Sequence, residues 1–186
     1  RPVGDAMATT IWGTSSSWTL TALPLFVWMG EILFRTKLSE NLFKGLSPWL
    51  SKLPGGLIHV NVVGCGLFAA ISGSSAATVA TVGKMSIPEL RKRKYPEKIL
   101  LGSLAGSGTL GLLIPPSIIL IIYGVTIEDS IAKLFMAGIF PGIMLAIIFM
   151  LYVVVWSIIN KKQMPKISEE FSFIEKVKRS KQLLPV

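Results

Sequence analysis

Charged residues are scarce in this sequence. Only 16% of its 186 residues are Asp, Glu, Lys or Arg, whereas a soluble domain typically carries about 25%. Hydrophobic residues make up 51% of the chain, and its mean hydropathy is +0.62. Two apolar runs, 99–125 and 134–159, each exceed the roughly 18–20 residues that cross a bilayer. The composition excludes an ordinary soluble domain and predicts an integral membrane protein.

Groups for catalysis and metal binding are also few. The chain has one cysteine, Cys65, and one histidine, His59, while Asp5 and Asp129 fall in expected loops. A single cysteine excludes a disulfide within the chain, and the remaining groups assemble no nucleophile–base pair or metal cluster. The sequence therefore predicts neither an enzyme nor a resident cofactor.

Positive charge is in excess, with a net charge of +9, but the basic residues gather at the ends of the apolar runs. At those positions the positive-inside rule and anionic lipid headgroups explain them. We therefore expect the lipid bilayer, and no nucleic acid, as the partner of this charge.

Basic residues also decide the expected topology of the segment 57–82. Lys52 precedes it and Lys92 follows it, each within a basic cluster, and the positive-inside rule puts both flanks in the cytoplasm. A single crossing would place one cluster outside, so a re-entrant helical hairpin is predicted. Two half-helices of about a dozen residues reach about half the membrane thickness, which puts the turn 72–75 near the midplane.

The whole fold is predicted to be all-α, with transmembrane helices, this re-entrant hairpin and a broken helix. Apolar spacing over 38–53 suits a helix lying in the membrane interface, although a loop helix packed on its own protein gives the same periodicity. Residues 1–167 are interpreted as a membrane domain holding an N-terminal repeat, and 168–186 as a cytoplasmic linker to a C-terminal half. The expected spans are 15–34, 99–125 and 134–159.

A second interruption lies inside the run 99–125. Its stretch 106–111 matches G-x-G-x-x-G, a pattern that binds dinucleotides when it follows a strand and opens a helix. Here a membrane span surrounds the motif, so a dinucleotide site is rejected.

The proline pair explains this interruption better. Pro115 and Pro116 have no backbone N–H, so helical hydrogen bonding fails over about one turn. The carbonyls of 108–114 are then free to face a cation, as in the broken helices of secondary transporters. Tight packing of small residues is the alternative, and that role is expected of Gly102 and Gly106.

Hydroxyl groups crowd the expected tip of the hairpin, where the residues are Ser72, Gly73, Ser74, Ser75 and Thr78. Hydroxyl oxygens are neutral ligands for a hard cation such as Na⁺ and donors to a substrate carboxylate. The half-helix that begins near Ser74 also directs its positive end at the tip, which favours an anion. Substrate binding is assigned to Ser75, Thr78 and Thr109.

Two titratable side chains, Glu31 and His59, lie close to expected spans. Intramembrane ionisable groups are functional candidates by default. However, Arg35 lies one turn from Glu31, and His59 follows a Pro-Gly-Gly sequence that ends a helix. A direct role and an interfacial position are both open for these two residues.

Five stretches, in this order, resemble the large membrane subunit of tripartite ATP-independent periplasmic (TRAP) transporters. They are 24–31 (PLFVWMGE), 55–61 (GGLIHVN), 71–76 (ISGSSA), 110–117 (LGLLIPPS) with Tyr123-Gly124, and 134–138 (LFMAG). The resemblance implies a multi-pass, elevator-type secondary transporter of the bacterial inner membrane that imports organic acids, such as C4-dicarboxylates, with sodium. It also implies two partners, a small membrane subunit and a periplasmic substrate-binding protein.

Site residues follow from the same resemblance, with sodium as the coupling ion and no other metal. The residues that it assigns to sodium binding are Ser72, Gly73 and Ser74 in the hairpin tip and Gly111, Ile114, Pro115 and Pro116 in the broken helix. Two other functions stay open at this stage. One is a sodium/carboxylate symporter that works without a binding protein, and the less favoured one is a membrane subunit with no transport role.

Overall fold

A computed structural model describes residues 3–16, 18–36 and 38–165, and every regular element within these ranges is helical. The expected linker 168–186 lies outside the described residues. In chain order the elements are α1 (Val3–Ser15), η1 (Trp18–Thr21), α2 (Ala22–Arg35), α3 (Leu38–Leu50), α4 (Ile58–Ser72), α5 (Ser75–Lys92), α6 (Glu97–Gly108), α7 (Leu110–Leu113), α8 (Ile118–Thr126), α9 (Ile131–Ile159) and η2 (Lys161–Gln163). The described chain is thus all-helical, as the sequence predicts.

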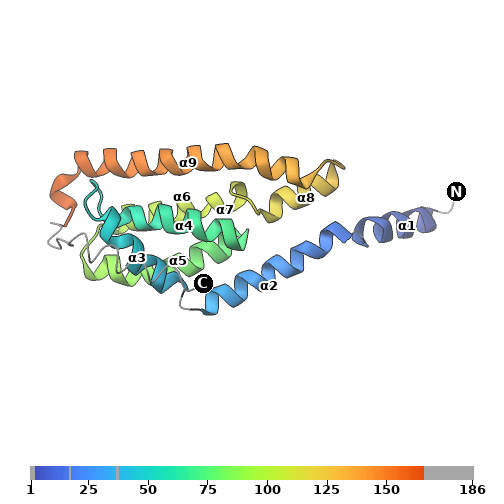
Figure 1. Cartoon of the computed structure of the whole chain (residues 1–186), viewed down its shortest axis with the longest axis horizontal. Helices are drawn as coiled ribbons and strands as arrows, with labels where there is room; N and C mark the ends of the chain where they lie inside the picture. Colours follow the sequence, from blue (N-terminus) through green and yellow to red (C-terminus); the bar gives the residue numbers. More distant parts are fainter. Residues whose placement is uncertain (1–2, 17, 37, 166–186) are drawn as a thin grey trace.

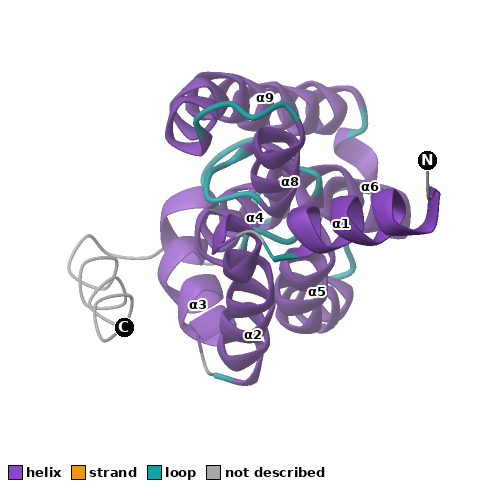
Figure 2. Cartoon of the chain, turned by 90° about the vertical axis from the view of Figure 1, so that its right-hand side faces the viewer, coloured by secondary structure: helices purple, strands orange, loops and turns teal. Residues whose placement is uncertain are grey.

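Helix α4 is the centre of the bundle. It packs against α5 and α6 most extensively and also contacts α2, α3, α7 and α9. Figure 2, which views the molecule from one end, shows α9 on one side of α4 and α2 with α3 on the other. A helix that is surrounded in this way must be apolar or small on all faces, and α4 buries Ile58, Val60, Cys65 and Phe68.

Helices α4 and α5 form an antiparallel hairpin. Helix α4 packs along α9, and the turn between α4 and α5 falls part-way along the length of α9 in Figure 1 instead of at its end. This is the geometry that a re-entrant hairpin requires, although its position in a membrane stays a prediction.

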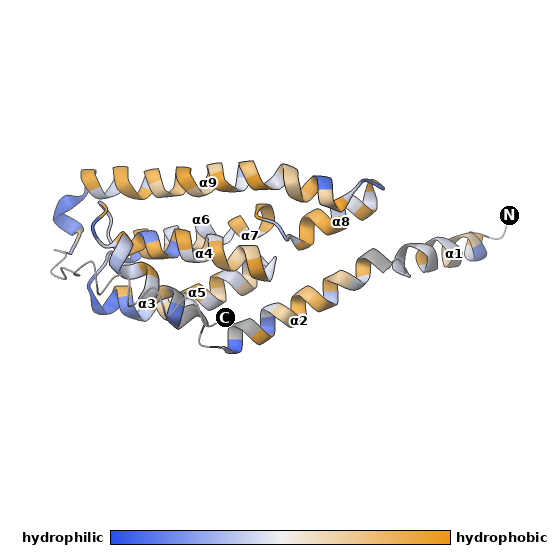
Figure 3. Cartoon of the chain, in the orientation of Figure 1, coloured by the Kyte–Doolittle hydropathy of each residue, from blue (hydrophilic) through white to orange (hydrophobic). Residues whose placement is uncertain are grey.

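Two segments are long and apolar enough to cross a membrane, namely Glu97–Thr126 and Ile131–Ile159. At 1.5 Å per residue a helix such as α9 spans about 43 Å, more than the roughly 30 Å of bilayer hydrocarbon. Large apolar side chains such as Phe140, Ile147 and Leu151 are exposed along α9, and Figure 3 shows its hydrophobic colour over most of its length. Lipid is the solvent that suits this exposed face.

The expected first span, 15–34, lies mainly on η1 and α2. Helix α1 precedes them and extends away from the bundle as the end of an arm (Figure 1). Helix α3 covers most of the expected interfacial helix and turns Phe43 and Ser47 inward, while Trp49 stays exposed. The inward face of α3 packs on its own protein, and whether the helix also lies in the membrane interface stays a prediction.

Charged residues separate to the two ends of the bundle. Hydrophilic residues gather where α5 ends and where the chain leaves α9, and again at the α8–α9 connection at the opposite end (Figure 3). The first group is basic and includes Arg91, Lys92 and Lys161, whereas the second contains Glu128 and Asp129. This distribution follows the orientation that the positive-inside rule predicts.

Candidate ion and substrate site

The hairpin turn consists of Gly73 and Ser74. Gly73 has a φ of 61° and closes α4 by donating its N–H to the Ala69 carbonyl at 3.0 Å. This left-handed backbone favours glycine. Ser74 is extended and caps α5, since its Oγ accepts the N–H of Ala77 at 3.4 Å. The C-terminal end of α4 and the N-terminal end of α5 therefore meet at one point.

The proline pair separates α7 from α8. Pro115 has no N–H, so the carbonyl of Gly111, four residues earlier, loses its helical donor. Pro116 removes the donor of Leu112 in the same way, but the Leu112 carbonyl accepts the hydroxyl of Ser117 at 2.7 Å instead. The Gly111 carbonyl is thus one oxygen that the break leaves without its helical donor, and the Ile114 carbonyl is another, because the Ile118 N–H donates to Gly73 instead.

These two interruptions meet in the structure. The N–H of Ile118 donates to the Gly73 carbonyl at 3.2 Å. A Cβ on Gly73 would lie 2.6 Å from the Pro116 carbonyl oxygen, and a Cβ on Gly111 would lie 2.9 Å from the Ser75 nitrogen. Both glycines are therefore needed for the close approach of backbone. The fold brings the predicted residues of the hairpin tip and of the broken helix together.

The hydroxyls at the tip differ in their partners. Ser72 Oγ and Thr78 Oγ1 are buried and lie 3.0 Å apart in a hydrogen bond. Ser75 Oγ is buried and has no partner among the described residues, and such a group calls for an ion or water. Thr109 is exposed and donates to the carbonyl of Gly106 at 2.6 Å, so the structure does not bring its hydroxyl to the tip.

The other side of the break rests on two glycines of α9 that sequence reasoning missed as site residues. A Cβ on Gly142 would lie 2.9 Å from Ile114 Cγ1, and one on Gly138 would lie 2.8 Å from the Leu113 carbonyl and 3.6 Å from Pro115 Cγ. Their G-x-x-x-G spacing was the signal, because it lets another backbone approach a helix closely. Ile114 and Pro115 thus pack on α9, while Gly111 faces the hairpin.

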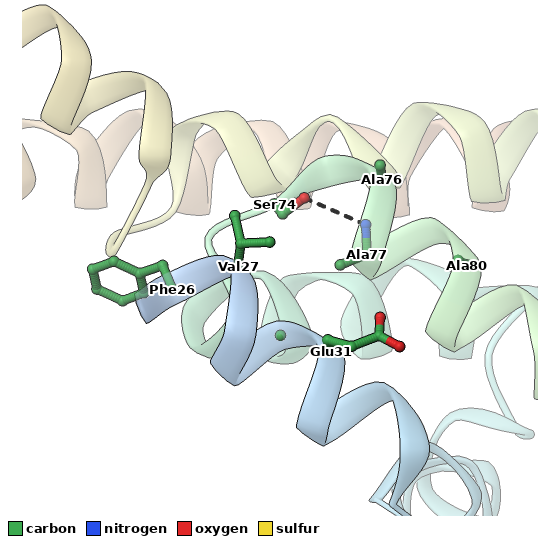
Figure 4. A pocket seen from close by; sticks show the side chains of 8 residues that line it. Phe26, Val27, Glu31, Ser74, Ala76, Ala77 and Ala80 are labelled. Carbon is green, nitrogen blue, oxygen red and sulfur yellow. Dashed lines mark hydrogen bonds between the residues drawn. The ribbon is translucent and has the colours of Figure 1, made fainter. Parts of the chain in front are cut away.

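A cleft of about 290 Å³ opens beside the hairpin tip. Figure 4 shows that Phe26, Val27 and Glu31 of α2 face Ser74 and Ala77 of the hairpin across it. The Glu31 carboxylate pairs with Arg35 at 2.8 Å on the surface of α2. The Arg35 guanidinium therefore offsets the negative charge of Glu31 at this cleft.

Two buried polar residues of α4 hold the bundle together away from the tip. His59 Nε2 lies 2.7 Å from the Pro54 carbonyl and its Nδ1 lies 3.1 Å from Met150 Sδ, so the ring joins the preceding loop to α9. Asn61, which sequence reasoning did not single out, donates its Nδ2 to Ser103 Oγ at 3.0 Å on α6. These contacts join α4 to its neighbours, and none of them is made with the hairpin turn.

Comparison with known proteins agrees with this architecture. A family model described as "Tripartite ATP-independent periplasmic transporter, DctM component" matches residues 2–183. The C4-dicarboxylate TRAP transporter large permease protein of Pseudomonas aeruginosa is 38% identical over 160 residues, which cover 86% of this chain and 37% of that protein. The 2,3-diketo-L-gulonate TRAP transporter large permease protein of Escherichia coli is 39% identical over 145 residues, or 78% and 34% of the two chains.

The ectoine TRAP transporter large permease protein of Halomonas elongata is 36% identical over 141 residues, which cover 76% of this chain and 33% of that protein. The chain thus spans about a third of the length of the curated relatives that it matches. These relatives are membrane permeases, which are transporters and not enzymes. The chain belongs to the DctM family, the large membrane subunits of TRAP transporters.

Proposed function

We propose that the protein containing this chain imports organic acids across the bacterial inner membrane by sodium symport. C4-dicarboxylates or related carboxylates are the proposed substrates. A periplasmic binding protein delivers the substrate, and a small membrane subunit completes this multi-pass transporter. The observation that supports the proposal most directly is the contact between the hairpin turn and the proline break, beside the unpartnered hydroxyl of Ser75.

The chemistry of this contact favours sodium. Its oxygen atoms are neutral: the Ser75 hydroxyl is buried without a partner, and the Gly111 carbonyl lacks its helical donor. The C-terminal end of α4 adds the negative end of a helix dipole. Unwound carbonyls and helix C-termini are the groups with which secondary transporters hold Na⁺.

The same turn offers a separate place for an anion. Helix α5 begins at Ser75 and directs its free N–H groups and positive dipole end at the turn. An organic carboxylate therefore binds on the α5 side and sodium on the side of the break. Of the three predicted substrate residues, Thr78 lies in this first turn of α5, the Ser75 hydroxyl is assigned here to the sodium side, and Thr109 lies on the exposed face of α6 and α7.

The identity of the substrate is assigned to the binding protein. The names of the relatives include C4-dicarboxylates, ectoine, isethionate and sialic acid, although all share a third or more of their residues with this chain over the matched part. Such similar permease segments do not distinguish among these compounds. The ligand of the cognate binding protein therefore predicts the cargo.

The experiment is uptake by the full-length protein in proteoliposomes, with its small subunit and its loaded binding protein. A sodium gradient is expected to drive accumulation, and replacing sodium by potassium on both sides should abolish it. Uptake that persists in potassium would overturn sodium coupling. Uptake of free substrate at the same rate without the binding protein would instead favour the binding-protein-independent symporter.

A further inference from the structure

A second cavity, lined by no residue of the hairpin turn, lies between α6 and α9. Its volume is about 380 Å³, many times the roughly 30 Å³ that one water occupies in the liquid. Lys98, Gly102, Ile148 and Tyr152 are exposed at its opening, so the cavity is a crevice that faces the surroundings of the protein. We call it the α6–α9 crevice.

The crevice is mostly apolar, and two glycines of α6, Gly102 and Gly106, line it. A Cβ on Gly106 would lie 3.5 Å from the Phe149 ring, which is ordinary packing, but a Cβ on Gly102 would meet no atom within 4 Å. Within the described residues, Gly102 therefore serves no tight helix packing. The groove that starts at Gly102 stays open because α9 does not fill it.

One positive charge stands at the opening. Lys98 is exposed, and no carboxylate of the described chain lies within 4.0 Å of its ammonium group. The nearby acid Glu97 is already held by Arg91 at 2.7 Å. Lys161 and Lys162 are also exposed at the same end of the bundle, so the opening lies in a region of positive potential.

We propose that the α6–α9 crevice binds an anionic phospholipid of the surrounding bilayer. Its phosphate pairs with the Lys98 ammonium, and one acyl chain runs along Gly102 and Gly106 beside Phe149. From Lys98 to Gly106 the helix rises about 12 Å, which gives the chain an apolar groove directly below the headgroup. This inference does not depend on sodium coupling.

A lipid fits the crevice better than a protein helix does. A helix packed over the opening would bury Lys98, and an unpaired buried ammonium is costly. A phospholipid brings its own negative charge to Lys98 and a flexible chain that adapts to an irregular groove. Anionic headgroups and juxtamembrane lysines attract one another for the same reason.

The test is native mass spectrometry of the full-length protein with phosphatidylglycerol and, in parallel, phosphatidylcholine. Lys98→Gln is expected to weaken phosphatidylglycerol binding about fivefold, the contribution of one lysine at an anionic surface, while Lys98→Arg retains it. Gly102→Leu should displace the acyl chain and lower the binding of the lipid without harm to folding, because its side chain enters empty space. Lys133→Gln, at the opposite end of α9, is the matched control and should bind as the parent does.

Equal binding of the two lipids, or the same loss in Lys133→Gln, would overturn the proposal, because the attraction would then be unspecific. Unchanged lipid binding in both Lys98→Gln and Gly102→Leu would overturn it as well. If Gly102→Leu leaves lipid binding intact but releases the small subunit from the purified complex, the crevice is a protein interface. Thermal unfolding of each variant without added lipid shows whether the fold is intact.

Discussion

The amide of Ile118 donates a hydrogen bond to the carbonyl of Gly73 across 3.2 Å, and this bond joins the first residue of α8 to the turn of the hairpin. The Pro116 carbonyl lies against the same glycine. Two stretches of irregular backbone thus satisfy and restrain each other inside the bundle. Apolar surroundings provide no water for such groups, so their mutual contact is what makes both irregularities stable.

Replacing Gly73 by alanine should separate the turn from the break. The left-handed backbone alone costs a non-glycine residue about 1–2 kcal/mol, and the new Cβ would lie 2.6 Å from the Pro116 carbonyl oxygen, which is backbone and cannot rotate away. A clearly lower unfolding temperature is expected. Gly13→Ala on α1, where a Cβ meets nothing within 4 Å, is the control and should leave stability equal or higher.

Replacing Ser75 by alanine distinguishes a ligand role of its buried hydroxyl from a packing role. Because this hydroxyl has no partner, Ser75→Ala should leave the free energy of unfolding unchanged or slightly raised. Sodium-dependent uptake should nevertheless shift to higher sodium concentration, since one oxygen of the proposed site is gone.

Ser86 provides the matched control, because its hydroxyl is also buried and unpartnered but lies near the other end of α5. Ser86→Ala should leave the sodium curve unmoved. If Ser75→Ala also leaves it unmoved, Ser75 is not a ligand. Ser74→Ala is a poorer test, since its loss as the cap of α5 costs about 1 kcal/mol on its own.

The local features of this site were predictable from residue chemistry, whereas their meeting was expected only from the family resemblance. Gly73 and the proline pair predict irregular backbone from their chemistry alone. That Gly111 faces Ser75 while Ile114 faces Gly142 depends on how α4, α7 and α9 pack, which no local pattern encodes.

The packing of the helical glycines was likewise not predictable from their spacing alone. Gly138 closely approaches Leu113 and Gly142 closely approaches Ile114, whereas Gly102 has no such neighbour among the described residues. Both Gly138–Gly142 and Gly102–Gly106 have the G-x-x-x-G spacing. The pattern permits close approach but does not say which face of a helix meets a neighbour. The exposed position of Thr109 has the same cause, because its face of the helix turns outward.

The environment of Tyr95 predicts that the protein loses stability at alkaline pH. Its hydroxyl accepts the N–H of Leu57 at 3.1 Å, at the end of the bundle outside the spans. Burial raises the pKa of Tyr95 above its usual value near 10, in spite of that hydrogen bond. The folded state therefore holds the proton more tightly than the unfolded state. The contribution of Tyr95 to the free energy of unfolding is fully present below about pH 10 and is lost as the pH rises through the folded pKa.

The control for this prediction is Tyr95→Phe. It leaves the buried Leu57 amide without its acceptor, at a cost of about 1–3 kcal/mol at neutral pH, and it removes the titrating group. Urea unfolding is measured from pH 8 to 11.5. The difference in the free energy of unfolding between parent and variant should narrow above pH 10. A constant difference over that range would contradict the assigned role of Tyr95.

Topology is tested by labelling single cysteines from either side of the membrane. Cysteines placed at Lys52 and Lys92 should react from the same, cytoplasmic side, and one at Glu128 from the opposite side, because basic residues flank the hairpin on both sides. All three positions are exposed, and the native Cys65 is buried and serves as a silent background. Opposite accessibility of Lys52 and Lys92 would make the hairpin a true crossing.

The proline pair tests whether the break itself is functional. In Pro115→Ala/Pro116→Ala, helical hydrogen bonds can re-form from Gly111 toward α8, and each proline removed from a helix interior relieves roughly 3 kcal/mol. The loss of the bond between Ile118 and Gly73 offsets part of this gain. We expect a thermal stability at least equal to that of the parent together with lost sodium-coupled uptake, since the Gly111 carbonyl turns back into the helix. Strained sites kept for function behave in this way.

Pro88→Ala is the matched control, because Pro88 lies inside α5 and is exposed, away from the turn. It should raise stability in the same manner and leave sodium-coupled uptake unchanged, so that stabilisation alone is excluded as the cause of lost transport. Uptake and unfolding temperature are measured on the same preparations. If the double variant retains sodium-coupled uptake, the break does not bind the ion, and the proline pair serves only to fit α7 and α8 against the glycines of α9.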